Sequence, residues 1–189
     1  MDNRKAILFS APSGSGKTTI IRQILEQFDC FEFSISATSR NPREGEVDGR
    51  DYYFLSPEDF DSRVEKDQFL EWEEVYQGTC YGTLKSEIDR IWNNGHVIIF
   101  DVDVNGGKNI KKYFGDDALA LFVMPPSVEE LERRLRGRGT ESEESIMKRL
   151  GRSALELNES VHFDKTIIND DLDRAVKETA DSIKKYLGL

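Results

Sequence analysis

The chain is poor in cysteine and has no long apolar run. Its 189 residues include two cysteines, Cys30 and Cys80, whose spacing fits no metal-binding or redox motif, so we interpret both as reduced thiols. The longest apolar run near the start, Ala6 to Phe9, is shorter than the core of a signal peptide. No segment approaches the roughly 20 apolar residues of a membrane span. We therefore expect a soluble, cytoplasmic protein with no membrane partner.

Positive charge is also scarce, with 26 basic against 36 acidic residues and a formal charge of −10. A charge of this sign repels polyanions at long range, which argues against nucleic acid as a partner. Any anionic ligand must be captured by local groups. The two histidines, His96 and His162, have no partner motif, so we expect structural or exposed roles for both. A homo-oligomer is left open by the sequence.

What the chain does have is a regular alternation of apolar runs and helical patterns. The runs that predict strands are Lys5 to Ser10, Val97 to Phe100, Leu119 to Met124 and Thr166 to Ile168. One predicted helix directly follows the glycine-rich stretch after Ser10. The other predicted helices cover residues 84–92, 108–114, 128–136, 145–161 and 172–187. This order predicts a single α/β domain with a mostly parallel sheet flanked by helices.

Two stretches interrupt the alternation. Residues 34–83 are rich in Tyr, Phe, Thr and Val and contain Ser56-Pro57, a helix-start signal, so they predict an inserted subdomain of short strands and one helix. Residues 127–152 carry two helix-cap signatures, Ser127 with Glu130 and Thr140 with Glu143, and predict two helices joined by a glycine-containing elbow. The expected core is then residues 1–33, 84–126 and 153–189.

A phosphate-binding loop is predicted between the first strand and the first helix. The segment matches the pattern G-x-x-x-x-G-K-[ST] except that alanine takes its first position, a match expected by chance in roughly one chain in a hundred. Backbone N–H groups of such a loop cradle phosphate, Lys17 neutralises β/γ charge and the Thr18 hydroxyl ligates Mg²⁺. The alternative is an ordinary strand-to-helix turn with an exposed lysine. The predicted ATP-binding residues here are Ala11, Pro12, Ser13, Gly14, Ser15, Gly16, Lys17, Thr18 and Thr19.

Longer motifs resemble one family. Residues 33–46 and 49–54 resemble the GMP-binding region of guanylate kinases, and six later segments resemble that family in the same order: Phe69 to Trp72, Tyr81 to Thr83, Asp101 to Asp103, Pro125 to Ser127, Gly137 to Thr140 and Ile168 to Leu172. The resemblance covers almost the whole chain. It implies a P-loop kinase with a three-layer core, a GMP-binding insertion at residues 34–83 and a helical lid at residues 127–152.

The activity implied by the resemblance is transfer of the γ-phosphoryl group of ATP to GMP, and to dGMP, with Mg²⁺, for the recycling of GMP. A glutamate suits guanine because its carboxylate can accept from both N1–H and the exocyclic amine, whereas adenine offers an acceptor at N1. Taken singly, these residues have ordinary alternatives as surface charges, solvated strand residues or subdomain core. The implied guanine contacts are Ser36, Glu71 and Thr83, and the implied phosphate contacts are Arg40, Arg43, Tyr52 and Tyr81.

For catalysis, the resemblance implies that lid arginines approach the transferred group while Lys17 holds the donor phosphates. No strong base is needed, because the attacking phosphate oxygen is already anionic. A solvated helix face with i,i+4 ion pairs would explain the same arginines. Asp101 is favoured over Asp103 as the carboxylate serving Mg²⁺ or the acceptor, and Asn169 resembles the adenine side. The implied catalytic residues are Lys17, Arg134, Arg138 and Arg149.

Two other functions are weighed against this one. A non-catalytic guanylate-kinase-like interaction module would have a degraded nucleotide site, which intact Lys17 and Thr18 argue against. An enzyme that phosphorylates a ribosyl bisphosphate would not need the guanine-reading carboxylate of Glu71. Because ATP and GMP bring several negative charges to an acidic chain, we also expect the insertion and the lid to close over the core and exclude water.

Overall fold

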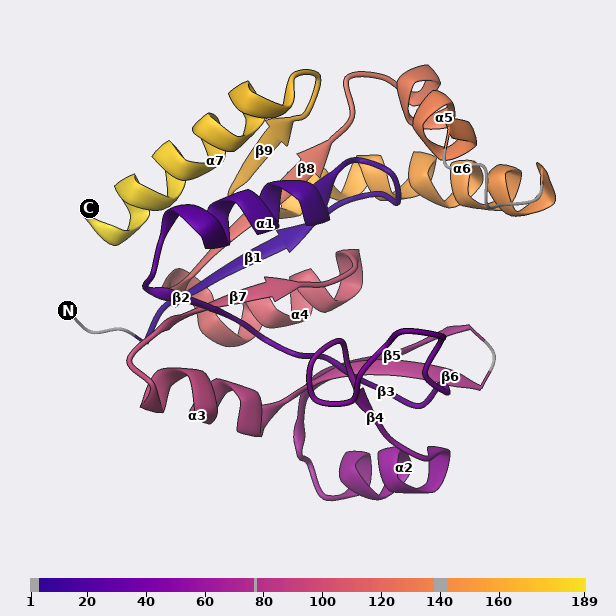
Figure 1. Ribbon diagram of the computed structural model, residues 1–189, viewed down its shortest axis with the longest axis vertical. Coiled ribbons are helices and arrows are strands. Elements are labelled where there is room, and N and C mark those ends of the chain that lie inside the picture. Colours follow the sequence, from indigo (N-terminus) through magenta and orange to yellow (C-terminus); the bar gives the residue numbers. More distant parts are fainter. Residues whose placement is uncertain (1–3, 77, 138–142) are drawn as a thin grey trace. The chain divides into compact units, whose positions relative to one another are not determined.

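The computed structural model describes residues 4–76, 78–137 and 143–189 (Figure 1). The described residues form two units. The first contains residues 4–5 and 30–100, and the second contains Ala6–Asp29 and Asp101–Leu189. The predicted division into core, insertion and lid stays a prediction.

The second unit is built on three parallel strands, β1 (Ala6–Ser10), β8 (Ala118–Met124) and β9 (Lys165–Ile168), in the order β1-β8-β9. Ala6 lies opposite Ala118, and Leu121 lies opposite Lys165. Every residue of β1 is buried, as expected for a parallel strand covered on both faces. The carboxyl end of β1 therefore leads directly from the core into the glycine-rich loop.

Helices cover these strands. Helix α1 (Lys17–Gln27) buries Ile20, Ile21 and Ile24 and packs against α7 (Leu172–Leu187), whereas α4 (Val104–Phe114) contacts β1 and β8. In Figure 1, α1 and α7 lie on one side of the strands and α4 lies on the other. The short 3₁₀ helices η1 (Gly115–Asp117) and η2 (Glu159–His162) lead into β8 and toward β9. This layered arrangement confirms the predicted α/β fold.

Two further helices of this unit, α5 (Val128–Gly137) and α6 (Glu143–Asn158), pack against each other. Their shared apolar cluster consists of Leu131, Leu135, Ile146 and Leu150. The hydroxyl of Ser127 accepts the backbone N–H of Glu130 at 3.2 Å and thus caps α5, as the sequence predicts. The second predicted cap, at Thr140, and Arg138 lie outside the described residues.

The first unit contains a parallel strand pair, β2 (Phe31–Phe33) with β7 (Val97–Asp101), and helix α3 (Lys85–Asn93). It also contains a four-stranded sheet in the order β4-β3-β6-β5, made of β4 (Tyr53–Phe54), β3 (Ala37–Thr38), β6 (Thr79–Leu84) and β5 (Phe69–Tyr76). Helix α2 (Pro57–Glu65) starts at the predicted position, because the Ser56 hydroxyl accepts the Asp59 N–H at 3.0 Å.

The core of the four-stranded sheet is aromatic. Phe60 of α2 stacks on Phe69 of β5 with ring centroids 4.5 Å apart, and Ala37 and Leu84 complete the buried cluster. Burial of this cluster fixes which faces of β3, β5 and β6 point away from α2. Short strands and one helix are thus present between residues 37 and 84, as expected, whereas their being an inserted subdomain stays a prediction.

Three elements differ from the sequence-based expectation. Strand β2 was not predicted, because three residues give too short a pattern to recognise. Helix α4 begins at Val104 rather than Lys108, because Asp103 caps it. The glycine at position 107 lies inside this helix because a side chain there would come within 3.0 Å of the Phe163 ring. Helix α6 begins at Glu143 and ends at Asn158, earlier than predicted at both ends, with η2 continuing the turn.

Within the described part of the chain, no helix combines the length and the apolar character needed to cross a bilayer. Neither Cys30 nor Cys80 forms a disulfide in the structure.

Candidate functional site

The glycine-rich loop joins β1 to α1 in the second unit. Gly14 and Gly16 have φ values of +94° and +90°, a conformation that side chains disfavour. Gly16 also has no room for a side chain, because a Cβ there would lie 2.3 Å from the amide nitrogen of Asn169. Gly16 is the N-cap of α1 and supplies no capping side chain. The loop therefore presents backbone N–H groups at a helix N-terminus, the arrangement that binds phosphate.

Asn169 holds this loop from the end of β9. Its side-chain amide donates to the carbonyl of Ser15 at 2.7 Å, and its own N–H donates to Met124 O at 2.8 Å. Asn169 is 5% exposed. We predicted it as a residue of the adenine side, and the structure adds that it supports the loop backbone.

Lys17, the first residue of α1, faces Asp101 and Val102 of the same unit. Its ammonium donates to the carbonyl of Val102 at 2.9 Å and forms an ion pair with Asp101. The lysine and aspartate side chains are 17% and 22% exposed, so both charges can be reached from solvent. Thr18 and Thr19 are exposed on the same first turn. The structure thus brings Lys17, Thr18 and Asp101 to one end of the strands.

Asp103 has a different role. One carboxylate oxygen accepts the N–H of Gly106 at 2.9 Å and caps α4, while the other lies 3.4 Å from the guanidinium of Arg152. A capping carboxylate is engaged with the backbone, so Asp101 is the better placed of the two aspartates for a ligand next to Lys17.

Two of the predicted lid arginines reach the loop. Arg134 of α5 donates to the carbonyl of Asn169 at 2.9 Å and pairs with Glu130 at 2.8 Å. Arg149 of α6 donates to the Ser13 hydroxyl at 3.0 Å. Helix α5 also packs on the loop itself, since a Cβ at Gly14 would lie 3.0 Å from the Leu131 side chain. Within the second unit, cations from two helices therefore surround the predicted phosphate site.

In the first unit, Arg40 is the centre of a polar cluster. Its guanidinium makes a bidentate contact with Glu46, at 2.6 and 2.7 Å, and its Nε donates to the Tyr81 hydroxyl at 3.1 Å. The guanidinium carbon lies 4.9 Å from the ring centroid of Tyr52. Three of the four predicted phosphate contacts are therefore adjacent. Arg43 has an exposed side chain and donates its backbone N–H to Glu46 at 2.7 Å.

Glu46 was not predicted as a site residue. Hydrogen bonds from Arg40, followed by that from the Arg43 backbone, lower the pKa of Glu46 to about 2. The same contact raises the pKa of Arg40 above its ordinary value. A sequence signal could have been the spacing to Arg40 and Arg43, but an acidic residue in a loop has no distinguishing pattern.

The predicted guanine contacts lie in one row across the strands. Glu71 of β5 pairs with Thr83 of β6, and the Thr83 hydroxyl donates to the Glu71 carboxylate at 2.7 Å. Ser36 precedes Ala37, which pairs with Gly82, so Ser36 is next in line to Thr83. A Cβ at Gly82 would lie 2.7 Å from the Glu71 carbonyl, which keeps that position free of a side chain.

Comparison with known proteins gives the family. The sequence profile described as guanylate kinase matches residues 3–186. The chain belongs to the guanylate kinase family. It is 51% identical to a guanylate kinase of Bacteroides fragilis over 185 residues, which is 98% of this chain and 91% of that protein. It is 49% identical to a guanylate kinase of Salinibacter ruber over 187 residues, 99% of each chain.

A solved structure agrees with this family assignment. The crystal structure of guanylate kinase from Anaplasma phagocytophilum matches with a TM-score of 0.73 and 28% identity, covering 97% of this chain and 84% of that one. The family resemblance predicted from the motifs is thus confirmed at the level of fold and family.

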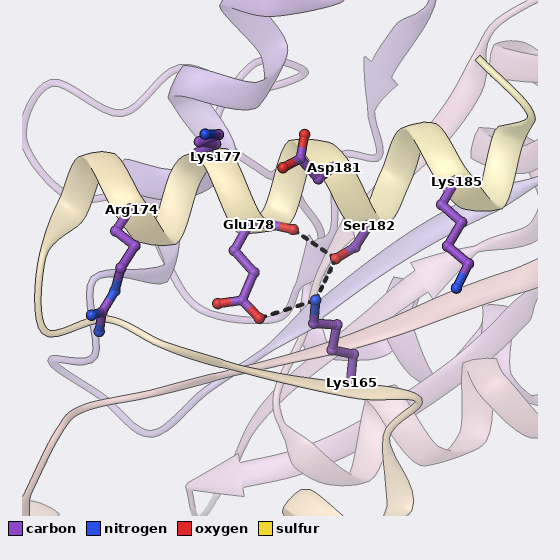
Figure 2. A pocket seen from close by; sticks show the side chains of 7 residues that line it. All are labelled: Lys165, Arg174, Lys177, Glu178, Asp181, Ser182 and Lys185. Atoms are coloured by element: carbon purple, nitrogen blue, oxygen red, sulfur yellow. Dashed lines mark hydrogen bonds and ion pairs between the residues drawn. The ribbon is translucent and has the colours of Figure 1, made fainter.

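One surface hollow is lined by none of the predicted site residues. It has a volume of about 430 Å³ and lies between β9 and α7 (Figure 2). Four basic and two acidic side chains line it. Lys165 is held by Glu178 at 3.0 Å and by Ser182 at 2.9 Å, and Arg174 forms an ion pair with Asp170. Two of the four basic groups are therefore already paired with carboxylates.

The histidines take no part in either cluster. His96 Nδ1 lies 2.8 Å from the Glu32 carboxylate, and His162 lies 3.7 Å from Glu159. Both contacts are local to helix and strand ends, as the absence of partner motifs suggested.

Proposed function

We propose that the chain transfers the γ-phosphoryl group of ATP to GMP, giving ADP and GDP, with a donor half-site in the second unit and an acceptor half-site in the first. Family membership supports this activity over nearly the full chain. The observation that supports the residue assignment is the pairing of Glu71 with Thr83, whose hydroxyl donates to the carboxylate, with Ser36 next to them in the strand register.

In the donor half-site, the backbone of residues 11–16 binds the phosphates of ATP and Lys17 neutralises their charge. Thr18 and Asp101 suit Mg²⁺, because both offer oxygen ligands and Mg²⁺ is held by few protein groups together with substrate phosphates. When bound there, the ion neutralises charge on the β- and γ-phosphates. The Lys17 ammonium then exchanges its contact with Asp101 for phosphate oxygen.

In the acceptor half-site, Glu71 accepts from guanine N1–H and the exocyclic amine, and Thr83 keeps the carboxylate in position. Arg40 binds the GMP phosphate with Tyr52 and Tyr81, and Arg43 approaches from the exposed side. Glu46 holds the Arg40 fork in a bidentate geometry that also fits phosphate. A phosphate group would accept the same two N–H donors.

Transfer itself needs positioning and charge neutralisation. An oxygen of the GMP phosphate attacks the γ-phosphorus as its bond to the β–γ bridging oxygen breaks and ADP leaves, and Arg134, Arg138 and Arg149 stabilise the negative charge spread over the transferred group. Excluding water from the site prevents hydrolysis of ATP. This exclusion requires the two half-sites to close around both substrates. Small-angle scattering profiles that are superimposable with and without both ligands would refute this closure.

We place the reaction in the cytoplasm, with dGMP as a second acceptor, in guanine nucleotide recycling. The test is an assay of ADP release with GMP, dGMP, AMP, CMP and UMP as acceptors. We expect turnover with GMP and dGMP and a loss of at least about 10⁴-fold in kcat/KM with AMP, because AMP leaves the Glu71 carboxylate without the two donors that guanine supplies. Equal rates with AMP and GMP would refute the Glu71 assignment, and no turnover with any nucleotide would favour an interaction module.

A further inference from the structure

A buried carboxylate lies next to the acceptor half-site. Glu87, in the first turn of α3, is 2% exposed, whereas its helix neighbours Ser86 and Asp89 are exposed. Removing a carboxylate from water is costly unless hydrogen bonds and an opposite charge replace the lost hydration. The hydrogen-bond partners of Glu87 must therefore offset the cost of burying its charge.

The carboxylate of Glu87 accepts four hydrogen bonds. Its Oε1 accepts from the Tyr53 hydroxyl at 2.7 Å and from Arg90 Nε at 2.8 Å. Its Oε2 accepts from the backbone N–H of Ile35 at 2.9 Å and from Arg90 Nη2 at 2.9 Å. Four acceptor positions are about what an ionised carboxylate offers, so this one is fully used. Arg90 is itself anchored by an ion pair with Glu32.

These partners are chain neighbours of the predicted GMP contacts. Ile35 precedes Ser36, and Tyr53 follows Tyr52. The carbonyl of Ser36 accepts the backbone N–H of Tyr53 at 2.9 Å. Glu87, Ile35, Ser36 and Tyr53 thus form a closed circuit of hydrogen bonds, in which one carboxylate holds both the segment that carries Ser36 and the strand that carries Tyr52.

We propose that Glu87 is a positioning residue of the acceptor half-site, which sets the affinity for GMP without touching it by fixing Ser36 and Tyr52 relative to each other. This inference rests on the proposed function of those two residues. Glu87 acts through the Ile35 N–H and the Tyr53 hydroxyl, so its effect is confined to the first unit.

The protonation states agree with this geometry. Burial alone would raise the pKa of Glu87, but hydrogen bonds from Arg90, Ile35 and Tyr53 lower it below its ordinary value, so the group stays ionised. Burial and the hydrogen bond to Glu87 raise the pKa of Tyr53 to about 12, which keeps the phenol a donor at neutral pH. Both partners hold the states that the circuit needs.

The decisive variant is Glu87→Gln. The Arg90 guanidinium contacts both carboxylate oxygens, so either orientation of a glutamine amide places an NH₂ group against an Arg90 donor. At least one hydrogen bond from Arg90 to Glu87 must then break, which loosens the anchor of the circuit while the side-chain shape is kept. We expect KM for GMP to rise about tenfold to a hundredfold, as for loss of a charged hydrogen bond, with KM for ATP within about twofold.

Two further variants complete the test. Asp89→Asn makes the same charge change at an exposed position of α3 and should leave both KM values as in the wild type. Tyr53→Phe removes only the hydroxyl that Glu87 accepts, and should raise KM for GMP by a smaller factor. The double variant should be less than multiplicative, because both changes break one circuit.

The outcomes separate the inference from the proposed function. A wild-type chain that turns over no GMP would refute the function, and the inference with it. An active wild type whose Glu87→Gln variant melts at a lower temperature but keeps the wild-type KM for GMP would overturn the inference alone. If Glu87→Gln does not fold, Tyr53→Phe decides: an unchanged KM for GMP overturns the proposal, and a selective rise supports it.

Discussion

Thr83 Oγ1 donates a hydrogen bond of 2.7 Å to Glu71 Oε1 across the β5–β6 pair. Thr83 is 1% exposed, so its hydroxyl has a fixed direction, and the bond holds the glutamate carboxylate along the row that begins at Ser36. A preorganised carboxylate loses little freedom when it binds a base, which favours tight and selective recognition. We therefore expect this pair to be the part of the proposed acceptor half-site most sensitive to substitution.

Glu71→Gln should lower kcat/KM for GMP by about 100-fold or more and reduce the preference for GMP over AMP, because the amide offers one acceptor where guanine presents two donors. The measurement is initial rates with both nucleotides. Thermal melting should remain within a few degrees of the wild type, since Glu71 is only half-buried. A variant that keeps the wild-type ratio of GMP to AMP rates would contradict the assignment.

Lys17→Ala should lower kcat by about 10²- to 10³-fold, the loss typical of one removed donor at a developing charge. Stability should change little, because the lysine is partly exposed and its ion pair with Asp101 is reachable by water. The matched control is Lys112→Ala, an exposed lysine of α4. Full activity in Lys17→Ala would remove this residue from the mechanism.

The sequence predicts long periodic elements well and short ones poorly. Helix α7 lies exactly at residues 172–187, as its periodicity indicates, and β8 and β9 lie within one residue of their predicted starts. Strand β2 was not predicted, because three residues are too few to show an alternation of apolar and polar side chains. The start of α4 escaped because Gly106 and Gly107 discourage a helix locally, whereas close packing on Phe163 requires a glycine at position 107.

For the site, a local motif is enough to predict the loop of residues 11–19, because these residues are chain neighbours. Ordered resemblance was needed for Arg40, Tyr52 and Tyr81, which come together only through strand pairing. Glu46 and Glu87 were missed, because an acidic residue becomes informative only when its partners are known. Both show that polar circuits between distant segments cannot be read from spacing.

We expect the free energy of unfolding at acid pH to depend on Glu46. Its pKa is about 2 in the folded chain against an ordinary 4.5, so the folded state binds fewer protons between these values. The stabilisation by Glu46 is then complete above about pH 4.5 and is lost as the pH falls toward 2. We expect Glu46→Gln to be less stable than the wild type at pH 7, with the difference shrinking below pH 4.5.

Urea unfolding midpoints from pH 7 to pH 2.5 would measure this. Glu44→Gln, at an exposed position two residues away, should follow the wild type throughout. A difference between wild type and Glu46→Gln that stays constant with pH would show that the Arg40 contact does not contribute in solution.

Arg149→Ala should lower kcat by about 10³-fold with little change in KM for GMP, as expected for an arginine that acts on the transferred group. Its contact with Ser13 already brings it to the loop. Arg133→Ala serves as the control, because Arg133 is 74% exposed and pairs with Glu130 on the helix surface. Single-turnover rates with saturating ATP and GMP would separate chemistry from binding. Equal rates in the two variants would favour a solvated helix face for both arginines.

We expect substitutions of Asp101, the last residue of β7, and of Asp103 to have different effects. Asp101→Asn should raise the Mg²⁺ concentration needed for half-maximal rate, because it weakens an oxygen ligand next to Lys17. Asp103→Ala should instead cost about 1 kcal/mol of stability, since it removes the cap that accepts the Gly106 N–H at 2.9 Å. Mg²⁺ titrations of the rate and urea unfolding of both variants give the comparison. Should Asp103→Ala shift the Mg²⁺ dependence while Asp101→Asn leaves it unchanged, the roles of the two carboxylates are reversed, and the capping contact of Asp103 must open when nucleotide binds.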